Sequence, residues 1–392
     1  MLNASSDFIQ ALKIPHKVLS IKLEIYDSQM NYLKEITTDT TSDIGYLSVN
    51  NSNPIRRSFS IKLNNKDGNY LFGQDNLIWL DKRIRLSTGL RLRDGTTEYV
   101  QQGIFVLTEP SDSHDLDGKY TTINAVDKAF FLTDKRGKFI NEQTIEVGAK
   151  ITDAIRIIAS HVGETMFNFD EIPTIENVVP YELTYSSTDN RWSAIQELAK
   201  LIKCSVYYDV YGYLRLKRVD LNELNSYPSV WTFTMGDNFY AGNTRKMDDG
   251  ELYNDIVVLG GRSDVAVSRY RLTVDETNPL WTDHPYSIQK IGINTYFHNN
   301  GSPDPLLFED SECKWRAKFE LMKSLGYTES VSMNIAPHFL LDADDIIEAY
   351  DQENNIEGKY IINSLNIPLS PQKMTLDIQK QVKVIENWDF II

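Results

Sequence analysis

Alternating hydrophobic and polar residues appear in the same three-strand order at two places in the chain. The first copy occupies residues 80–126 and the second occupies residues 341–379. In each copy an edge strand is followed by a strand that begins Gly-x-aromatic, and then by a regularly alternating strand. A period of two predicts half-buried β-strands, because successive side chains point to opposite faces of a sheet. The repetition predicts two small β-barrels.

The chain between the two copies has a helical pattern. Residues 150–159 and 193–202 place apolar side chains three and four positions apart, which predicts amphipathic helices. We therefore predict an α+β, β-dominated fold. Its expected parts are a first barrel (1–135), an inserted small α/β module (136–218), a β and loop region with a connecting helix at 310–325 (219–327), and the strands that complete a second barrel (328–392).

The negative charge of the chain is concentrated near its end. The net charge is -15, and residues 251–392 carry 12 basic and 22 acidic side chains. Residues 340–358 contain no base and seven acids: Asp342, Asp344, Asp345, Glu348, Asp351, Glu353 and Glu357. Because phosphate binding requires a basic face, this balance argues against a protein that grips nucleic acid.

No pattern in the chain predicts catalysis, a cofactor site or a metal site. The six histidines are scattered, and the motif Asp342-x-Asp344 lacks the glycine that a calcium loop requires, since Ile347 stands there. Cys204 and Cys313 each adjoin an apolar helix face and are interpreted as packed small hydrophobes. There is no signal-peptide pattern and no apolar run long enough to span a membrane. We expect a protein that is not an enzyme and has no membrane partner.

One basic cluster stands out in the first copy: Lys82, Arg83, Arg85, Arg91 and Arg93. It has two interpretations. Either it is a solvated barrel face, or it pairs with the acidic residues 340–358 of a neighbouring copy of the chain. The pattern favours reversed charges at corresponding positions of the two copies, with Arg83 and Arg85 in one and Asp345 and Glu348 in the other.

Four segments, in this order and spacing, resemble the tail and baseplate hub proteins of tailed bacteriophages and related injection machines. Residues 59–70 resemble the strand and N-x-D-G-x-aromatic turn of that family. The strands at 102–107 and 122–128 resemble its Gly-x-aromatic signature. Residues 151–216 resemble its inserted module, and residues 337–347 resemble its entry to the second barrel.

The resemblance implies two tail-tube-like β-barrels with an inserted module and a helical connection. It implies a homotrimer whose paired barrels form a pseudo-sixfold ring, joining a hexameric tail tube to a threefold tail tip. The implied partners are further copies of the chain, the tail-tube or distal tail protein, the tape-measure protein, and tail-tip, spike or lysin proteins. DNA is expected to pass through the ring without specific binding. The implied location is the virion tail tip or baseplate, with assembly in the host cytoplasm.

The charge pattern adds an expectation about this ring. An acidic lining repels phosphates, so DNA slides through without sticking. The charged residues of both copies are therefore candidates for either the channel wall or the seam between subunits, and the sequence does not choose between these positions. The candidates are Asp342, Asp344, Asp345, Glu348, Asp351, Glu353, Arg83 and Arg85.

The alternative function is a tail-associated module that binds or degrades the cell wall. Some proteins of this kind continue into a peptidase or glycosidase domain, and we expect none here because the chain ends at Ile392, shortly after the second copy. Trp281 and Tyr286 lie in a predicted long loop, where aromatic rings stack on sugars. Most other aromatic residues alternate within strands or helix stripes, which favours the structural hub.

Overall fold

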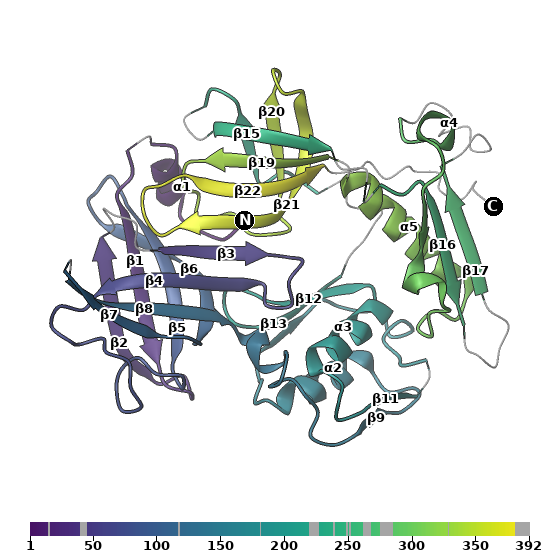
Figure 1. The fold of residues 1–392 in the computed structure, drawn as a ribbon, viewed down its shortest axis with the longest axis horizontal. Helices are drawn as coiled ribbons and strands as arrows, with labels where there is room; N and C mark the ends of the chain where they lie inside the picture. The colour runs from purple at the N-terminus through teal and green to yellow at the C-terminus, as the bar shows by residue number, and fades with distance from the viewer. Residues whose placement is uncertain are drawn as a thin grey trace.

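The computed structural model describes residues 1–380, apart from residues 15, 40–44, 117, 181, 219–226, 238–239, 248–249, 251, 262–267, 275–284 and 328. It confirms the α+β, β-dominated fold (Figure 1). Trp281, proposed above as a sugar-stacking residue, lies outside the described residues. Tyr286 packs against the small hydrophobic core around α5 (Asp310–Tyr327).

Within the described residues, fourteen strands form one hydrogen-bonded sheet whose main path runs β15-β19-β22-β21-β3-β4-β8-β6-β5-β1-β2. Three strands lie off this path: β20 pairs with β21 and with β14, and β7 pairs with β8. The strands from the first part of the chain are β1 (Leu19–Tyr26), β2 (Tyr32–Asp39), β3 (Gly45–Asn50), β4 (Arg57–Asn64), β5 (Arg83–Arg91), β6 (Thr97–Leu107), β7 (Ser111–Asp115) and β8 (Gly118–Asp127). Those from the last part are β14 (Trp231–Thr234), β15 (Tyr240–Met247), β19 (Glu329–Ile335), β20 (Ile346–Asp351), β21 (Ile356–Pro368) and β22 (Met374–Lys380).

The two predicted copies are present as β5-β6-β8 and β20-β21-β22, and neighbouring strands are antiparallel in both. The glycines of the Gly-x-aromatic strands give their alignment, since Gly103 faces Leu86 and Gly358 faces Ala349. On this alignment Arg85 of the first copy corresponds to Glu348 of the second, so the predicted reversal of charge is present at this position. Arg83 corresponds to Ile346 and not to Asp345, because Asp345 precedes the strand.

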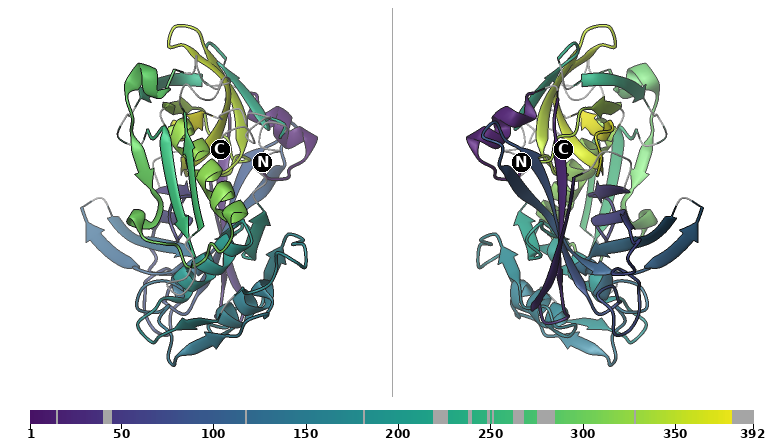
Figure 2. Two further views of the ribbon diagram at one scale, coloured as in Figure 1. Left: turned by 90° about the vertical axis from the view of Figure 1, so that its right-hand side faces the viewer. Right: turned by 90° about the vertical axis from the view of Figure 1, so that its left-hand side faces the viewer.

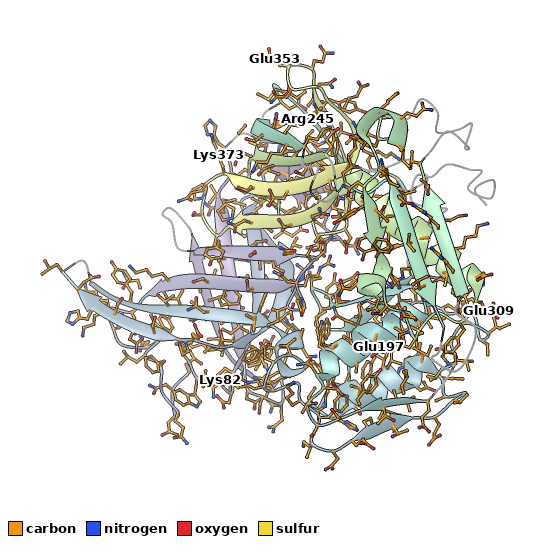
Figure 3. The ribbon with its side chains drawn as sticks, turned by 45° about the vertical axis from the view of Figure 1, so that its right-hand side comes forward. Lys82, Glu197, Arg245, Glu309, Glu353 and Lys373 are labelled. Carbon is orange, nitrogen blue, oxygen red and sulfur yellow. The ribbon has the colours of Figure 1, made fainter. Side chains whose placement is uncertain are left out.

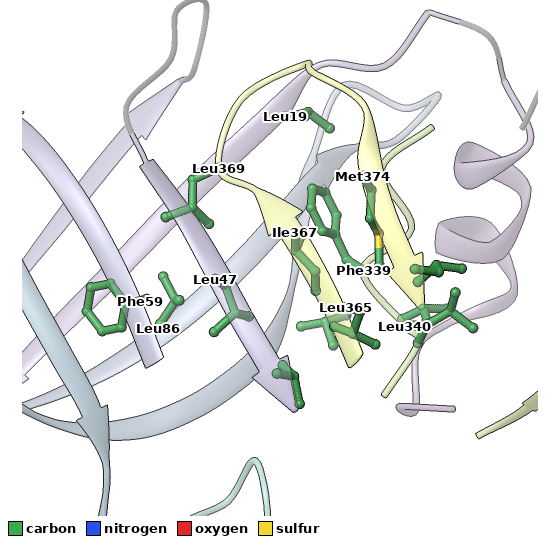
Figure 4. Close-up of a cluster of buried hydrophobic side chains, with 14 of the residues drawn as sticks. Leu19, Leu47, Phe59, Leu86, Phe339, Leu340, Leu365, Ile367, Leu369 and Met374 are labelled. Atoms are coloured by element: carbon green, nitrogen blue, oxygen red, sulfur yellow. The ribbon is translucent and has the colours of Figure 1, made fainter. Parts of the chain in front are cut away.

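Strand β3 joins the two halves of the sheet by pairing antiparallel with β21. Leu47 and Val49 of β3 face Ile367 and Leu365 of β21 across this join, and all four side chains are buried. Figure 4 shows Leu47 beside Leu365 and Ile367, in a core that residues of both halves share. Both copies therefore contribute to one continuous sheet with one core, which the repeat alone did not predict.

The shared core predicts that the two halves unfold together. Val49→Ala removes two buried methyl groups at the join and should lower the free energy of unfolding by about 1–2 kcal/mol, since a buried methylene contributes ~0.8 kcal/mol and a cavity adds to the loss. Urea unfolding followed by circular dichroism should show one transition that moves as a whole. Ser48→Ala, on the opposite face of β3, is the matched control. A transition that splits into two would contradict this expectation.

The inserted module packs two helices against small sheets and has its own core. The helices are α2 (Ile151–Ser160) and α3 (Arg191–Leu201), close to the predicted ranges. The remaining elements are η1 (Lys128–Phe131), β9 (Gln143–Ile145), β10 (Phe167–Phe169), β11 (Leu183–Tyr185), β12 (Cys204–Tyr208) and β13 (Leu214–Arg218). In Figure 2 the module, in teal, lies below the main sheet, and the second half of that sheet, in yellow, lies above.

A third layer packs the predicted helix α5 against a three-stranded sheet. Its other elements are β16 (Asp255–Gly260), β17 (Ser268–Thr273), α4 (Ile288–Ile291), β18 (Thr295–Phe297) and η2 (His298–Gly301). Cys313 lies in this core and Cys204 in the core of the module. Burial raises the pKa of the Cys204 thiol to about 12 and that of Cys313 to about 11, so both remain neutral packing residues, as predicted. The short α1 (Ser6–Leu12) contributes Phe8 and Leu12 to the main core.

Candidate functional site

Two consecutive arginines connect the halves of the sheet through ion pairs. Arg56 ends the turn between β3 and β4, and Arg57 begins β4. Both side chains are buried. The Arg57 guanidinium donates a hydrogen bond to Asp342, in the loop that leads into β20. The backbone N–H of Arg57 donates to Asp127 at the end of β8, at 2.8 Å. Arg57 thus links β4 and β8, from the first part of the chain, to the loop that precedes β20.

Arg56 extends this junction to the inserted module. Its Nη1 lies 2.7 Å from Asp344 Oδ2, and its Nη2 donates to the carbonyl of Ala343 at 2.6 Å. The guanidinium carbon stands 4.1 Å from the centre of the Tyr207 ring of β12, a cation–π geometry. Asn51 donates to the other oxygen of Asp344 at 2.7 Å. We call Arg56, Arg57, Asp342 and Asp344 the junction cluster.

The electrostatics of the junction suit a permanent structural ion cluster. Burial alone would raise the pKa of Asp342, but the charges of Arg57 and Arg56 outweigh it and lower the pKa to about 2. At Asp127 burial prevails and raises the pKa to about 6, against the hydrogen bonds from the N–H groups of Arg57 and Ala129. Asp342 is therefore an anion throughout the physiological pH range, held between two cations.

The other predicted acids have different surroundings. Asp345 pairs with the amino group of Met1, and its Oδ2 accepts a hydrogen bond from the N–H of Asp342 at 2.8 Å. Asp351 is buried at the end of β20 and accepts from Asn243 Nδ2 at 2.6 Å. The structure thus gathers Asp342, Asp344 and Asp345 at the junction, with partners inside the same chain.

Glu348 and Glu353 lie further along the acidic segment. The Glu348 carboxylate accepts hydrogen bonds of 3.2 and 3.3 Å from Ser229 and Thr232 at the edge of β14. Glu353 is exposed in the turn between β20 and β21. These two are the acidic candidates with the weakest attachment to the fold.

The basic cluster lies on the other half of the sheet. Arg85 pairs with Glu24 of β1 at 3.3 Å, and Arg83 donates to the backbone carbonyls of Asp81 and Lys82 at 3.3 and 3.1 Å. Figure 3 shows Lys82 near the bottom of the molecule and Glu353 at the top. The basic cluster and the acidic turn of one copy therefore do not meet.

The described part of the chain holds no group of three or more His, Cys, Asp or Glu side chains placed to bind a metal ion. Among the same residues, no helix is both long and apolar enough to cross a membrane.

Sequence reasoning did not single out Arg56 and Arg57. Their partners Asp344 and Asp342 lie 288 and 285 positions further along the chain. The available signal was a pair of adjacent arginines directly before an alternating strand, in a region otherwise balanced in charge. That signal does not say which carboxylates the arginines contact.

No family model matches the sequence, and no curated protein matches it. Solved structures do match its fold. The tail protein from Neisseria meningitidis MC58 superimposes with a TM-score of 0.63 and 12% identity, covering 92% of this chain and 96% of that protein. The 43 kDa tail protein of prophage MuSo2 from Shewanella oneidensis gives 0.59 at 11% identity, covering 92% and 98%. Prophage tail protein gp18 from Listeria monocytogenes EGD-e gives 0.52 at 14% identity, covering 93% and 95%.

The chain therefore has the fold of phage tail proteins over nearly its whole described length. The resemblance to phage tail and baseplate proteins that the sequence indicated is therefore confirmed.

Proposed function

We propose that the chain is a structural hub of a phage tail or a related injection particle, with a mechanical and not a catalytic role. One observation carries the proposal: a three-strand unit occurs twice within one continuous sheet, in a chain whose fold matches a phage tail protein over 92% of its length. Three copies of such a chain present six similar units around an axis. The resulting ring then matches the sixfold symmetry of a hexameric tail tube and also the threefold symmetry of a tail tip.

The proposed partners are those of an adaptor: the tail-tube or distal tail protein on one side, tail-tip, spike or lysin proteins on the other, and the tape-measure protein or DNA in the channel. The net charge of -15 supports passage without binding, because phosphates are repelled. The proposed location is the tail tip of the particle.

We propose that the seam between copies pairs Arg83 and Arg85 with Glu348 and Glu353. Figure 3 shows Lys82 of the basic cluster in the lower part of the molecule and Glu353 of the acidic turn at the top, so contact between this cluster and this turn requires a second copy. Asp342, Asp344 and Asp345 already have cationic partners inside the chain. Glu348 accepts hydrogen bonds of 3.2–3.4 Å from the hydroxyl groups of Ser229, Thr232 and Tyr350, and Lys359 stands opposite it on β21.

Electron microscopy tests the hub. In particles that carry an epitope-tagged copy of the chain, antibody label should appear at the tail tip, and averaged images should show threefold symmetry there. Label distributed along the tube, or absence from the particles, would overturn the proposal.

The seam has a separate test. Arg83→Glu combined with Arg85→Glu places like charges against the acidic turn and should weaken self-association about tenfold or more. Analytical ultracentrifugation over a range of salt concentrations measures this, since screening reduces interactions between exposed charges. Arg156→Glu, at an exposed ion pair of the module, is the matched control. Unchanged association of the double variant would contradict the seam.

A further inference from the structure

The main sheet contains the same four-strand order twice. The first unit is β3-β4-β8-β6 and the second unit is β15-β19-β22-β21. Neighbouring strands are antiparallel throughout both units. The repeat therefore extends past the three strands that the sequence pattern indicated, and β15 of the second unit corresponds to β3 of the first.

Strand β7 corresponds to the end of β21, where the two units join. Residues 364–368 of β21 pair with β22 on one side and with β3 on the other. With Gly103 aligned to Gly358, residues 109–113 correspond to 364–368, and β7 begins within this segment. The pairing of β7 with β8 is shifted by one residue relative to that of β6, and β21 shows the same shift in its pairing with β22. β7 thus has the position of a joining segment.

The edges of β7 and β15 that such a join would use are unpaired within one copy. Among the described residues β7 pairs only with β8, and β15 pairs only with β19. All five side chains of β7 are exposed. In Figure 1, β7 lies at the left in the lower half and β15 lies at the top, so these two edges of one copy do not meet. An unpaired edge offers a row of backbone N–H and C=O groups to a strand of another chain.

The alignment of the two units also gives the register of a pairing between β7 and β15. Inside the chain, Ile367 of β21 faces Leu47 of β3. Counting across the paired strands from the aligned glycines, the counterparts are Asp112 of β7 and Arg245 of β15. Arg245 is 30% exposed and pairs with Glu329 at 3.0 Å. Asp112 accepts hydrogen bonds from a backbone N–H and a hydroxyl group, and no cation contacts it among the described residues. Opposite charges would thus replace the apolar pair.

The backbone gives a second correspondence. The N–H of Leu369, just after β21, donates to the carbonyl of Gly45 in β3 at 2.9 Å. The counterparts are His114 of β7 and Asn243 of β15. Because backbone groups alternate between the two edges of a strand, positions 112 and 114 direct theirs to the unpaired edge of β7.

The two edges are also complementary in charge. The charged side chains of β7 and β8 are three acids and one base: Asp112, Asp115, Asp127 and Lys119. Those of β15 and β19 are two bases and one acid: Arg245, Lys246 and Glu329. Charged groups that contact these strands, Lys62 on one side and Lys380 and Asp351 on the other, leave both signs unchanged. Net charges of opposite sign favour contact between the β7 edge and the β15 edge.

We propose that β7 of one copy pairs antiparallel with β15 of the next copy, with Asp112 opposite Arg245 and the His114 N–H donating to the Asn243 carbonyl. The interface repeats between copies the pairing that β21 and β3 make inside each copy. It joins different surfaces of two copies, so it is heterologous and can close a ring. It rests on the proposed function, because it takes several copies of the chain to assemble around one axis.

Disulfide cross-linking of the full-length chain, purified and in particles, tests the register. Ser113→Cys combined with Thr244→Cys places two thiols directly opposite each other, and both positions are exposed. Mild oxidation should give dimers and trimers on non-reducing gels. The yield should be about tenfold higher than for Ser113→Cys with Lys246→Cys, two residues out of register, since diagonal Cβ atoms are too far apart for a disulfide. The native thiols do not interfere, because Cys204 and Cys313 are buried.

A charge reversal tests the same edge without a cross-link. Asp112→Arg places two cations opposite each other and should weaken self-association about tenfold in analytical ultracentrifugation. Thermal unfolding should stay nearly unchanged, because the Asp112 side chain is exposed. Asp153→Arg, at an exposed ion pair of the module, is the matched control.

Three results would overturn the pairing: no cross-linked multimers, equal cross-linking in both registers, or unchanged association of Asp112→Arg. Any of these results together with antibody label at the tail tip would overturn the pairing and leave the proposed hub in place. Cross-links in the expected register without label at the tip would support the pairing and overturn the hub.

Discussion

Arg57→Ala is expected to lower the free energy of unfolding by about 3 kcal/mol, the lower end of the range for a buried ion pair, because the Asp342 side chain is 19% exposed. Asp342 would remain in the junction with its nearest cation gone, and Arg56 would be left as its remaining cationic partner at 3.7 Å. The substitution also loosens the contact between the first half of the sheet and the loop before β20. Urea unfolding monitored by fluorescence measures the change.

Two further variants show whether the loss comes from the uncompensated charge. Arg156→Ala breaks an ion pair whose side chains are 45% and 57% exposed, and it should cost at most about 0.5 kcal/mol. The double variant Arg57→Met with Asp342→Leu removes both charges and should recover most of the loss, since apolar replacement of a buried pair is often neutral. If Arg57→Ala behaved like Arg156→Ala, the junction cluster would not be a stabilising contact.

Lowering the pH from about 7.5 to about 4.5 should destabilise the unaltered chain by about 2–3 kcal/mol more than the His338→Gln variant. His338 is fully buried, with its ring 4.4 Å from Trp231 and 6.3 Å from Phe233, measured between ring centres. Burial lowers the pKa of His338 from 6.5 to about 3, and nearby cations, Lys17 among them, act in the same direction.

The direction of this effect follows from proton binding. Below pH 6.5 the unfolded chain binds a proton at His338 that the folded chain does not bind until about pH 3. Stability from this residue is therefore complete above pH 6.5 and is lost as the pH falls through that window.

Asp127 acts in the opposite sense, because burial raises its pKa from 3.8 to about 6, so the folded chain binds its proton first and gains stability as the pH falls. The total pH dependence of the unaltered chain mixes both effects. The difference between the unaltered chain and His338→Gln isolates the histidine, since Asp127 is present in both. Unfolding curves at the two pH values supply the measurement, and a difference that is independent of pH would show that His338 does not titrate in this window.

The local pattern of side chains was sufficient to predict most individual elements. Alternation in 102–107 and 122–128 predicted strands found in β6 and β8, and spacings of three and four predicted α2, α3 and α5. These predictions succeed because residues only a few positions apart in the sequence share the buried face of a helix or strand. Cys204 and Cys313 are predicted to be packed residues for the same reason, since each adjoins an apolar helix face in the sequence. In the structure Cys204 begins β12 and Cys313 lies in α5.

The partners of the acidic residues 340–358 could not be predicted from neighbouring residues. The sequence placed Asp342, Asp344 and Asp345 together as one acidic group, with channel and seam as alternatives. In the folded chain these three carboxylates form ion pairs with Arg56, Arg57 and the amino group of Met1. Each of these cations is about 285 or more positions away in the sequence. A carboxylate carries the same local signal whether it faces solvent, a channel or a buried arginine, so only its surroundings in the fold distinguish these cases.

Local side-chain patterns are enough to predict most strands and helices, the repeated unit and the kind of fold to which the chain is similar. The pairing of β3 with β21, which joins the two units into one sheet, becomes visible only in the folded chain, as do the contacts of Arg56 and Arg57 with the module and with the loop before β20. This difference comes from the range of the interactions. Periodicity acts between adjacent residues, whereas strand pairing and buried ion pairs depend on which distant segments the whole chain brings into contact.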